Sequence, residues 1–317
     1  MRALDSSRAF ELAEPAEREA AAAVRARRPH FSASALNAYA ECERKWFYRY
    51  VCAAVDDPGS AASAYGSAFH LALERFHERY VHPQPDDAAA MHGDLAREID
   101  AAFAQYRHGF PTAVEFEIQM RRAHRTARKY VEWLAAESKR APFTVVGREL
   151  PVQLDLEGFT FIGFIDRLDR DAQTGGVTVV DYKTGSIAAS ASEYLQVVRE
   201  FGDFQLPFYY WVRTAAGDRV TRLALLPLKD ALLDVRPVSL EVVPVPAAAA
   251  RRDAPVGTIS IADLERAKER MIEICRELTS AQPRSFAPAT DPQACVFCAY
   301  ALACTRRPPP DGNRFGR

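Results

Sequence analysis

Two aspartates and a lysine near the middle of the chain have the types and spacing of a site that cleaves phosphate esters. Residues 158–170 (GFTFIGFIDRLDR) and 176–185 (GVTVVDYKTG) have the period of two of β-strands, and the turn DAQTGG joins them. This pattern predicts an antiparallel hairpin. If the turn is symmetric about its centre, Asp166 lies directly opposite Asp181 on the neighbouring strand. The Cβ atoms of such opposed residues are about 5 Å apart.

Two carboxylates held so close need a cation between them, because like charges in opposed positions repel. Mg²⁺ or Mn²⁺ is the expected cation, since hard ions of this kind take oxygen ligands and retain water. Lys183 shares a strand face with Asp181, so it could orient the attacking water or stabilise negative charge that develops on the phosphate. His70, on a helical segment, could complete the coordination. The alternative is a surface hairpin whose acids and lysine form ordinary ion pairs. Apolar neighbours favour the metal site over this alternative: Ile162, Phe164, Val177 and Val179.

Three cysteines near the C-terminus form a second group that could bind metal. Cys295, Cys298 and Cys304 follow the pattern C-x2-C-x5-C, and six cysteines in 317 residues are too few for a disulfide scaffold. A tetrahedral zinc site or an iron–sulfur cubane takes four thiolates, so one ligand must come from elsewhere, and spacing alone does not separate the two. Cys52 and Cys275 are expected to be small buried hydrophobes.

A basic stretch of a predicted helix is the third group of residues with a potential chemical function. Its cations could neutralise phosphates and steer a DNA strand toward the metal, although charge runs on helices are commonly solvated faces. The residues are Arg121, Arg122, Arg125, Arg128 and Lys129. Trp46, Tyr48 and Tyr50 could stack on bases, but core positions are the more frequent role of such aromatics.

Helices and strands of recognisable period surround these residues. Residues with helical spacing or caps predict helices at 31–51, 66–80, 95–106, 115–140, 205–216 and 259–278. Runs with a period of two predict strands at 144–154, 158–170, 176–185, 219–228 and 234–243. Residues 81–93 are expected to be a loop and residues 244–257 a linker. On the helix at 66–80, Glu74 and His77 are expected to belong to a polar face.

Composition excludes several classes of protein. Hydrophobic residues make up 48% and charged residues 26% of the chain, which is typical of globular proteins. A net charge of −1 excludes a globally basic, histone-like binder. No apolar run approaches the roughly 18 residues of a membrane span, and the N-terminus lacks a secretory pattern. We therefore expect a soluble cytoplasmic protein without a membrane partner. The sequence also lacks G-x-x-x-x-G-K-[ST], so a P-loop motor is excluded.

The order of these motifs resembles the PD-(D/E)XK nuclease superfamily, and specifically its RecB-type group. The segments IDRLDR and VVDYKTG resemble the nuclease core, GSAFHLALE the helix with a metal-binding histidine, and QLPFYYW the Gln-x3-Tyr helix. The segments around Cys42 and CVFCAYALAC resemble the ends of its iron–sulfur subgroup, which includes AddB-type subunits and CRISPR adaptation nucleases. The likeness spans about residues 31–304. Glu43 departs from it, since many members have Pro after the first cysteine.

The resemblance implies a role for individual residues. Those of the metal site are ligands His70, Asp166, Asp181 and the Tyr182 carbonyl, with Lys183 as the catalytic lysine. Gln205 and Tyr209, one helical turn apart, match positions that contact substrate or support the lysine; the alternative for both is a polar helix edge. Glu149 lies on an upstream strand where members often carry an acid. Cys42 matches the fourth cluster cysteine, and the resemblance favours [4Fe–4S] over zinc.

Together these expectations describe an α/β protein with a restriction-endonuclease-like core: a mixed central sheet flanked by helices, an N-terminal helical region and a cysteine staple. The expected parts of the chain are a leader (1–30), one nuclease domain (31–304) and a disordered tail (305–317). Within the domain we expect a helical part (31–140), a catalytic core (141–245) and the C-terminal helix with the cysteines (258–304). The expected activity is that of a Mg²⁺- or Mn²⁺-dependent DNA exonuclease on single-stranded ends, in repair, recombination or defence. The alternative is a non-catalytic DNA-binding scaffold in a helicase–nuclease complex, and a helicase is therefore a potential partner. A redox enzyme is a third hypothesis.

Overall fold

The computed structural model describes residues 30–54, 60–229, 235–244, 256–280, 286–296, 298–301 and 303–304. The expected leader up to residue 29, the tail from residue 305 and residues 245–255 of the expected linker lie outside this part. No helix within it is long and apolar enough to cross a membrane.

In the described part of the chain seven strands form one sheet, and the sheet is mixed, as the sequence predicted. Their path is β1-β3-β4-β5-β6-β7, and β2 pairs with β3 alone. The pairs β1–β3, β4–β5 and β6–β7 are parallel, whereas the pairs β2–β3, β3–β4 and β5–β6 are antiparallel. The strands are β1 (His30–Phe31), β2 (Phe143–Leu156), β3 (Phe159–Asp171), β4 (Val177–Lys183), β5 (Val220–Pro227), β6 (Val238–Val243) and β7 (Val256–Ser260).

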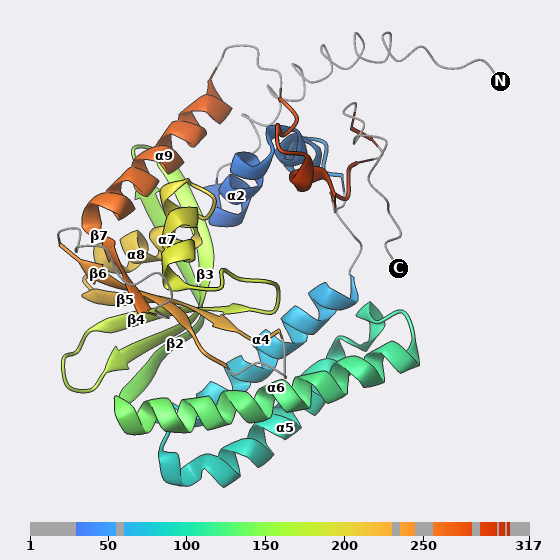
Figure 1. Cartoon of the computed structure of the whole chain (residues 1–317), viewed down its shortest axis with the longest axis vertical. Coiled ribbons are helices and arrows are strands. Elements are labelled where there is room, and N and C mark those ends of the chain that lie inside the picture. The colour runs from blue at the N-terminus through green and yellow to red at the C-terminus, as the bar shows by residue number, and fades with distance from the viewer. Residues whose placement is uncertain are drawn as a thin grey trace.

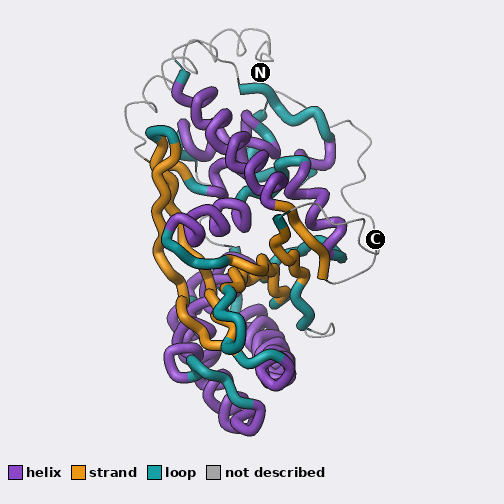
Figure 2. Tube along the Cα trace, turned by 90° about the vertical axis from the view of Figure 1, so that its left-hand side faces the viewer, coloured by secondary structure: helices purple, strands orange, loops and turns teal. Residues whose placement is uncertain are grey.

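Helices cover both faces of the sheet. On one side α4, α5 and α6 pack together below the strands, and on the other side lie α2, α7, α8 and α9 (Figure 1). In the view turned by 90° the strands run between these two sets of helices (Figure 2). The longer helices are α2 (Ala33–Glu41), α4 (Ala61–Arg79), α5 (Ala88–Gln105), α6 (Ala113–Arg140), α7 (Ala191–Arg199), α8 (Gln205–Ala215) and α9 (Ile261–Thr279). Short helical segments are α3 (Glu43–Trp46), η1 (Phe47–Val51), η2 (Pro85–Asp87), η3 (Arg107–Gly109) and η4 (Pro292–Cys295).

Two hydrophobic cores result, one on each face of the sheet. In β4, Val177 and Val179 belong to the core under α8 and α9, whereas Val180 and Tyr182 belong to the core under α4 and α6. Successive strand residues point to opposite faces, so a strand covered on both sides must be apolar at nearly every position. The run VTVVDYK is accordingly buried almost throughout, and Asp181 is carried into the interior with it.

The first predicted helix is interrupted at Cys42. This residue has extended backbone angles (φ −164°, ψ 114°), so α2 ends before it and α3 begins after it. The Cys42 sulfur accepts a hydrogen bond from the Lys45 amide (3.4 Å), which satisfies a backbone donor at the start of α3. The expectation of one continuous helix over 31–51 is therefore wrong, because Cys42 lies in an extended break between two helices.

The elements β1, β7 and α7 were not expected, and two helices begin earlier than predicted: α4 at Ala61 and α5 at Ala88. The strands β1 and β7 have two and five residues, and α7 has nine, so their own periodicity is weak. The expected loop at 81–93 is also partly wrong, because α5 already begins at Ala88 after a turn containing Pro85.

Candidate metal-dependent active site

The site lies where β3 and β4 separate. Their paired residues end at Arg167 and Val180, and the next step in this register places Asp166 opposite Asp181, as the symmetric turn predicted. The Tyr182 amide donates a hydrogen bond to Asp166 Oδ2 (2.5 Å). The aspartate side chain thus closes the end of the ladder and is held in place by the partner strand.

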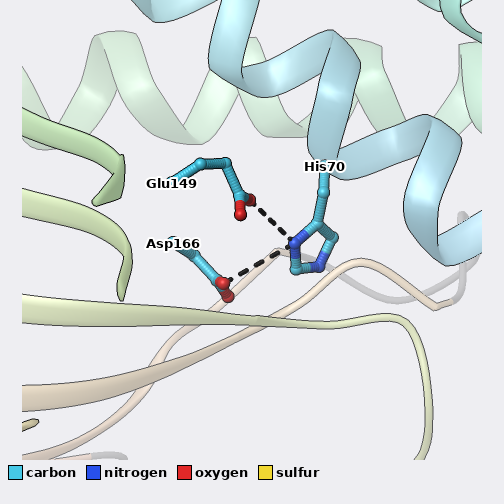
Figure 3. A group of neighbouring side chains, drawn as sticks. All are labelled: His70, Glu149 and Asp166. Atoms are coloured by element: carbon cyan, nitrogen blue, oxygen red, sulfur yellow. Dashed lines mark hydrogen bonds and ion pairs between the residues drawn. The ribbon is translucent and has the colours of Figure 1, made fainter. Parts of the chain in front are cut away.

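His70, Glu149 and Asp166 converge at this point from three elements (Figure 3). His70 Nδ1 lies 3.1 Å from Glu149 Oε1 and 3.6 Å from Asp166 Oδ1. One ligand atom from each residue lies within 4.8 Å of the other two. Carboxylate oxygens with one imidazole nitrogen can bind a divalent ion such as Mn²⁺ or Mg²⁺. Helix α4 supplies the histidine, β2 the glutamate and β3 the aspartate.

Glu149 occupies an irregular position in the β2–β3 ladder. Arg148 pairs with Arg167 and Leu150 with Ile165, so Glu149 faces Asp166 across the strands. Its φ of 37° lies in the left-handed region, which non-glycine residues adopt rarely and mainly at functional sites. The twist brings its carboxylate beside that of Asp166.

Asp181 is the most deeply buried of the acids. Its side chain is 1% exposed, and its Oδ2 forms an ion pair with Lys183 Nζ at 2.6 Å. Its Oδ1 has no hydrogen-bond partner among the described residues. A buried carboxylate oxygen without a donor is costly, so this oxygen is a natural ligand position for a cation.

The electrostatics of the site also favour a bound cation. Burial and the neighbouring charge of Asp181 raise the pKa of Asp166 to about 7. Burial likewise raises the pKa of Asp181, against the effect of Lys183. Burial alone would lower the pKa of His70, but its hydrogen bond to Glu149 and the charge of Asp166 raise it. The carboxylates repel one another, and a divalent ion among them would remove that repulsion.

Lys183 is held by a chain of hydrogen bonds to α8. Lys183 Nζ donates to Gln205 Oε1 (2.7 Å), and Gln205 Nε2 donates to the Tyr209 hydroxyl (3.1 Å). Tyr209 in turn donates to the backbone carbonyl of Phe164. Gln205 and Tyr209 are thus directly connected to the lysine and are not an isolated polar helix edge. Burial alone would lower the pKa of Lys183, but the Asp181 charge beside it raises the value, so the lysine is cationic.

An open cleft of about 610 Å³ reaches the site at His70 and Glu149. One wall is a stripe of α4 that includes Ser63, Ser67, His70 and Glu74. The other lining residues are Tyr106, Glu149, Phe164 and Thr184. Gly66 lets α4 approach the loop after β4, since a Cβ there would lie 3.1 Å from Thr184 Oγ1.

His77 does not belong to a polar helix face, and that expectation is wrong. It is buried, and its Nε2 lies 2.5 Å from the Tyr130 hydroxyl. Arg167 donates to the same hydroxyl (2.6 Å) and forms a buried ion pair with Asp169 (2.8 Å). Burial and the charge of Arg167 hold the pKa of His77 well below its usual value, so it is a neutral part of the core under α6.

The five basic residues predicted to bind DNA lie on α6, outside the residues that line the cleft. Arg121, Arg125 and Arg128 are exposed. Arg122 instead donates to the Lys229 carbonyl (2.6 Å) and covers the Tyr65 ring at 4.7 Å. Lys129 is half-buried. Trp46 is buried, which agrees with the core reading of that aromatic.

Four cysteines line one small cavity between the two ends of the described chain: Cys42, Cys295, Cys298 and Cys304. Segment α2 lies beside the C-terminal segment (Figure 1). Amides of Lys45 and Ala289 donate to the Cys42 sulfur (3.4 and 3.3 Å). Burial, with the nearby Cys42 and Cys295, raises the pKa of Cys298. Four thiols that line one cavity suit an all-cysteine metal site, because a bound cation would allow them to ionise together.

The two remaining cysteines differ from each other. Cys275 is buried in the core, as predicted, and burial raises its pKa. Cys52 is exposed, so the expectation that it is a buried hydrophobe is wrong. It follows the π-helical segment η1, at the point where the chain leaves the core.

Comparison with known proteins gives one family. The model of the PD-(D/E)XK nuclease superfamily matches residues 30–305. No curated protein matches the chain. Fourteen chains of solved structures match. One of them, described as "Crystal structure of SSO0001", is 12% identical, covers 87% of this chain and 86% of that chain, and has a TM-score of 0.34. The range matched by the family includes the whole cleft and all four cysteines of the cavity.

Proposed function

The chain belongs to the PD-(D/E)XK nuclease superfamily, and from this premise we propose that it hydrolyses phosphodiester bonds of DNA with Mg²⁺ or Mn²⁺. The observation that carries the proposal is the convergence of His70, Glu149 and Asp166, of which His70 and Glu149 line an open cleft. Nucleases of this superfamily use divalent metals, and the three side chains could bind one.

The residues that would hold the ion are His70, Glu149 and Asp166, with Asp181 and the Tyr182 carbonyl completing the site. The unpartnered Oδ1 of Asp181 and the raised pKa of Asp166 both support this assignment. Such an ion, when bound, lowers the pKa of a coordinated water and neutralises charge on the phosphate. The raised pKa also means that Asp166 must release its proton before it can serve as a ligand.

Lys183 stabilises negative charge that develops on the phosphate. Its raised pKa keeps it protonated, so it is suited to electrostatic stabilisation and poorly suited to act as a general base. Gln205 and Asp181 fix its ammonium group, each within 2.7 Å, and Tyr209 fixes Gln205. This preorganisation matters because a lysine that had to reorient during the reaction would lose part of its effect.

The finer parts of the proposal concern the substrate and the cysteines. We assign the enzyme to the RecB-type group, acting as an exonuclease on single-stranded DNA ends in repair, recombination or defence, with a helicase as partner. The exposed basic residues of α6 would hold the DNA outside the cleft. We assign a [4Fe–4S] cluster to the four cysteines, with zinc as the alternative. Iron and sulfide analysis of anaerobically purified protein distinguishes them, since zinc protein is colourless and contains no sulfide.

Cleavage of end-labelled DNA tests the activity. Linear single-stranded, linear double-stranded and circular single-stranded DNA are incubated with Mg²⁺, Mn²⁺ or EDTA. We expect metal-dependent loss of the linear single strand and no loss of the circle. Asp181→Asn and Lys183→Met should each reduce cleavage by about 10²–10³-fold, while DNA binding is retained. Lys229→Met, which removes an exposed cation that does not line the cleft, is the matched control. Binding without any metal-dependent cleavage by the wild type would contradict the proposal and favour the scaffold alternative.

A further inference from the structure

An uncharged and partly apolar surface extends from the metal site along the outer face of the β2–β3 hairpin. Phe164 is 59% exposed and Ile162 is 40% exposed. Their cross-strand partners are Pro151 and Gln153, both exposed. Single exposed apolar residues are common on protein surfaces, but neighbouring ones that form a patch beside a cleft are typical of surfaces that contact a ligand or a partner. Ile162 and Phe164, which the sequence identified as apolar neighbours of the two aspartates, are thus both exposed on this face.

The inner face of the same strand explains why Phe164 must point outward. Phe161 and Ile165 are buried against the core on the α8 side. A Cβ on Gly163 would lie 2.9 Å from the Phe208 ring, so α8 packs directly on the backbone there. Because successive residues of a strand point to opposite faces, Ile162 and Phe164 must then face away from α8. Phe164 is thereby held in the cleft and cannot fold back into the core.

The position of Phe164 is also fixed relative to the catalytic lysine. Its carbonyl accepts the hydrogen bond from Tyr209, which leads through Gln205 to Lys183. Asp166 lies two residues further along the same strand. The backbone that carries the aromatic ring is thus held at a fixed place beside the metal ligands, which suits a group that sets the register of a bound strand.

The two walls of the cleft differ in chemistry. On the hairpin side the cleft is lined by Glu149 and Phe164, and beyond Phe164 the strand face continues outside the cleft with the uncharged Pro151, Gln153 and Ile162. The α4 wall offers the exposed hydroxyls of Ser63 and Ser67, near the N-terminus of the helix. The uncharged surface from Phe164 outward suits nucleobases, whereas hydroxyl groups suit the sugar–phosphate backbone.

We propose that Phe164 is a stacking platform for an unpaired nucleobase next to the phosphate that is cleaved. The inference rests on the proposed nuclease function and adds to it a substrate requirement. A base inside a duplex is stacked on both faces and cannot reach the ring, so the strand must be single at this point. Because every base has a π-face, stacking on Phe164 is tolerant of sequence. The half-buried Tyr106 lies in the same cleft.

Binding measurements with normal and base-free DNA test this site. All proteins carry Asp181→Asn, which slows cleavage enough for binding of the DNA to be measured in Mg²⁺. The probes are a fluorescein-labelled 15-nucleotide oligo(dT) and a strand of equal length made of abasic residues. We expect Phe164→Ala and Phe164→Leu to weaken oligo(dT) binding by about tenfold, the range of one lost base–aromatic stack. Binding of the abasic strand should be unchanged, and Phe164→Trp should bind oligo(dT) as tightly as Phe164 does.

The leucine variant separates stacking from a general apolar contact. Leucine retains an apolar surface but has no π-face, so a surface that docks another protein would tolerate it. Val146→Ala, at an exposed apolar position of β2 outside the cleft lining, is the matched control. Equal oligo(dT) affinity of Phe164 and Phe164→Leu would overturn the proposal and assign the surface to a protein contact. Cleavage by protein with intact Asp181 is measured in parallel, because its complete absence would refute the nuclease function independently of Phe164.

Discussion

Glu149 and Glu74 are two carboxylates on the walls of one cleft, and the structure separates their roles. Glu149 lies 3.1 Å from His70 and faces Asp166, whereas Glu74 is not part of the convergent group. Burial and the charge of Glu149 raise the pKa of Glu74. Removing Glu74 would thus relieve repulsion, while removing Glu149 would delete a ligand.

We therefore expect Glu149→Gln to raise the Mg²⁺ concentration needed for half-maximal cleavage by roughly tenfold or more, within the range seen for groups around metal sites. Glu74→Gln, the matched control, should leave that concentration nearly unchanged. Metal titrations of cleavage by the two variants and the wild type are the measurement. Equal metal requirements of the two variants would remove Glu149 from the set of ligands.

At this scale the sequence predicted the aspartates better than their surroundings. The register of Asp166 and Asp181 follows from a symmetric turn, which is local information. Glu149 was reached only through family resemblance, because the backbone twist that turns it toward Asp166 has no signal in residue types. His77 was misjudged because its burial depends on the packing of α6, which is distant in sequence.

Helix α9 shows how one element is fixed at its N-terminus. Ser260 and Asp263 form a capping box, with the Ser260 hydroxyl donating to Asp263 Oδ2 (2.7 Å) and accepting from its amide (3.1 Å). Arg199, at the end of α7, donates to both oxygens of Asp263 (3.0 and 3.2 Å). Burial alone would raise the pKa of Asp263, but these hydrogen bonds lower it to about 2. The cap thus also joins α7 to α9.

The stability that Asp263 contributes should depend on pH. Its pKa is about 2 in the folded chain and about 3.9 in an unfolded chain, so the contribution is present above about pH 4 and is lost as the pH falls toward 2. This difference in pKa corresponds to about 2 kcal/mol in the free energy of unfolding. We expect Asp263→Asn to lower the midpoint of urea unfolding at pH 7. The difference between the midpoints of the variant and the wild type should become smaller between pH 4 and 3.

Glu265→Gln on the same helix serves as the control for this measurement. Glu265 forms an ion pair with Lys268 (2.6 Å) whose carboxylate is 42% exposed, and exposed pairs contribute little. Its urea midpoint should match the wild type at each pH. A gap for Asp263→Asn that stays constant down to pH 3 would show that its ionised form is not what stabilises the cap.

Among the elements, length decided what could be predicted. The helices α4, α6 and α9 and the strands β2 to β5 carry enough residues for their period to show. The elements β1, β7 and α7 have two to nine residues, and β1 and β7 exist because they pair with β3 and β6. The break at Cys42 was missed because its cause, contact with residues near 289, lies at the other end of the chain.

In the whole molecule, the two ends of the described chain are joined by more than cysteines. Phe286 stacks on Phe47 and Trp46 at ring distances of 4.9 and 5.7 Å. Arg44 Nε donates to the Phe286 carbonyl (2.7 Å), and the Tyr48 hydroxyl donates to the Ala303 carbonyl (3.1 Å). These contacts bury aromatic surface whether or not a metal is bound. The ends should therefore remain associated, more weakly, when one thiol is lost.

This packing sets the expected size of the effect of Cys42→Ala. A metal that links Cys42 to Cys295 closes a loop of on the order of 250 residues, and crosslinks of long loops contribute several kcal/mol. Since the aromatic contacts already restrict the ends, we expect a loss of about 2–4 kcal/mol, a large part of a typical total of 5–15 kcal/mol. The melting temperature and the metal content should fall together.

The control is Cys52→Ala, which removes an exposed thiol from the same region. It should keep the wild-type melting temperature and metal content. Cleavage by Cys42→Ala, measured below its melting temperature, should persist in the fraction that remains folded, because His70 to Lys183 belong to a cleft built on the sheet and α4. A variant with full metal content and an unchanged melting temperature would show that Cys42 is not a ligand. Loss of cleavage at an unchanged melting temperature would instead show that the cysteine centre acts on the active site directly.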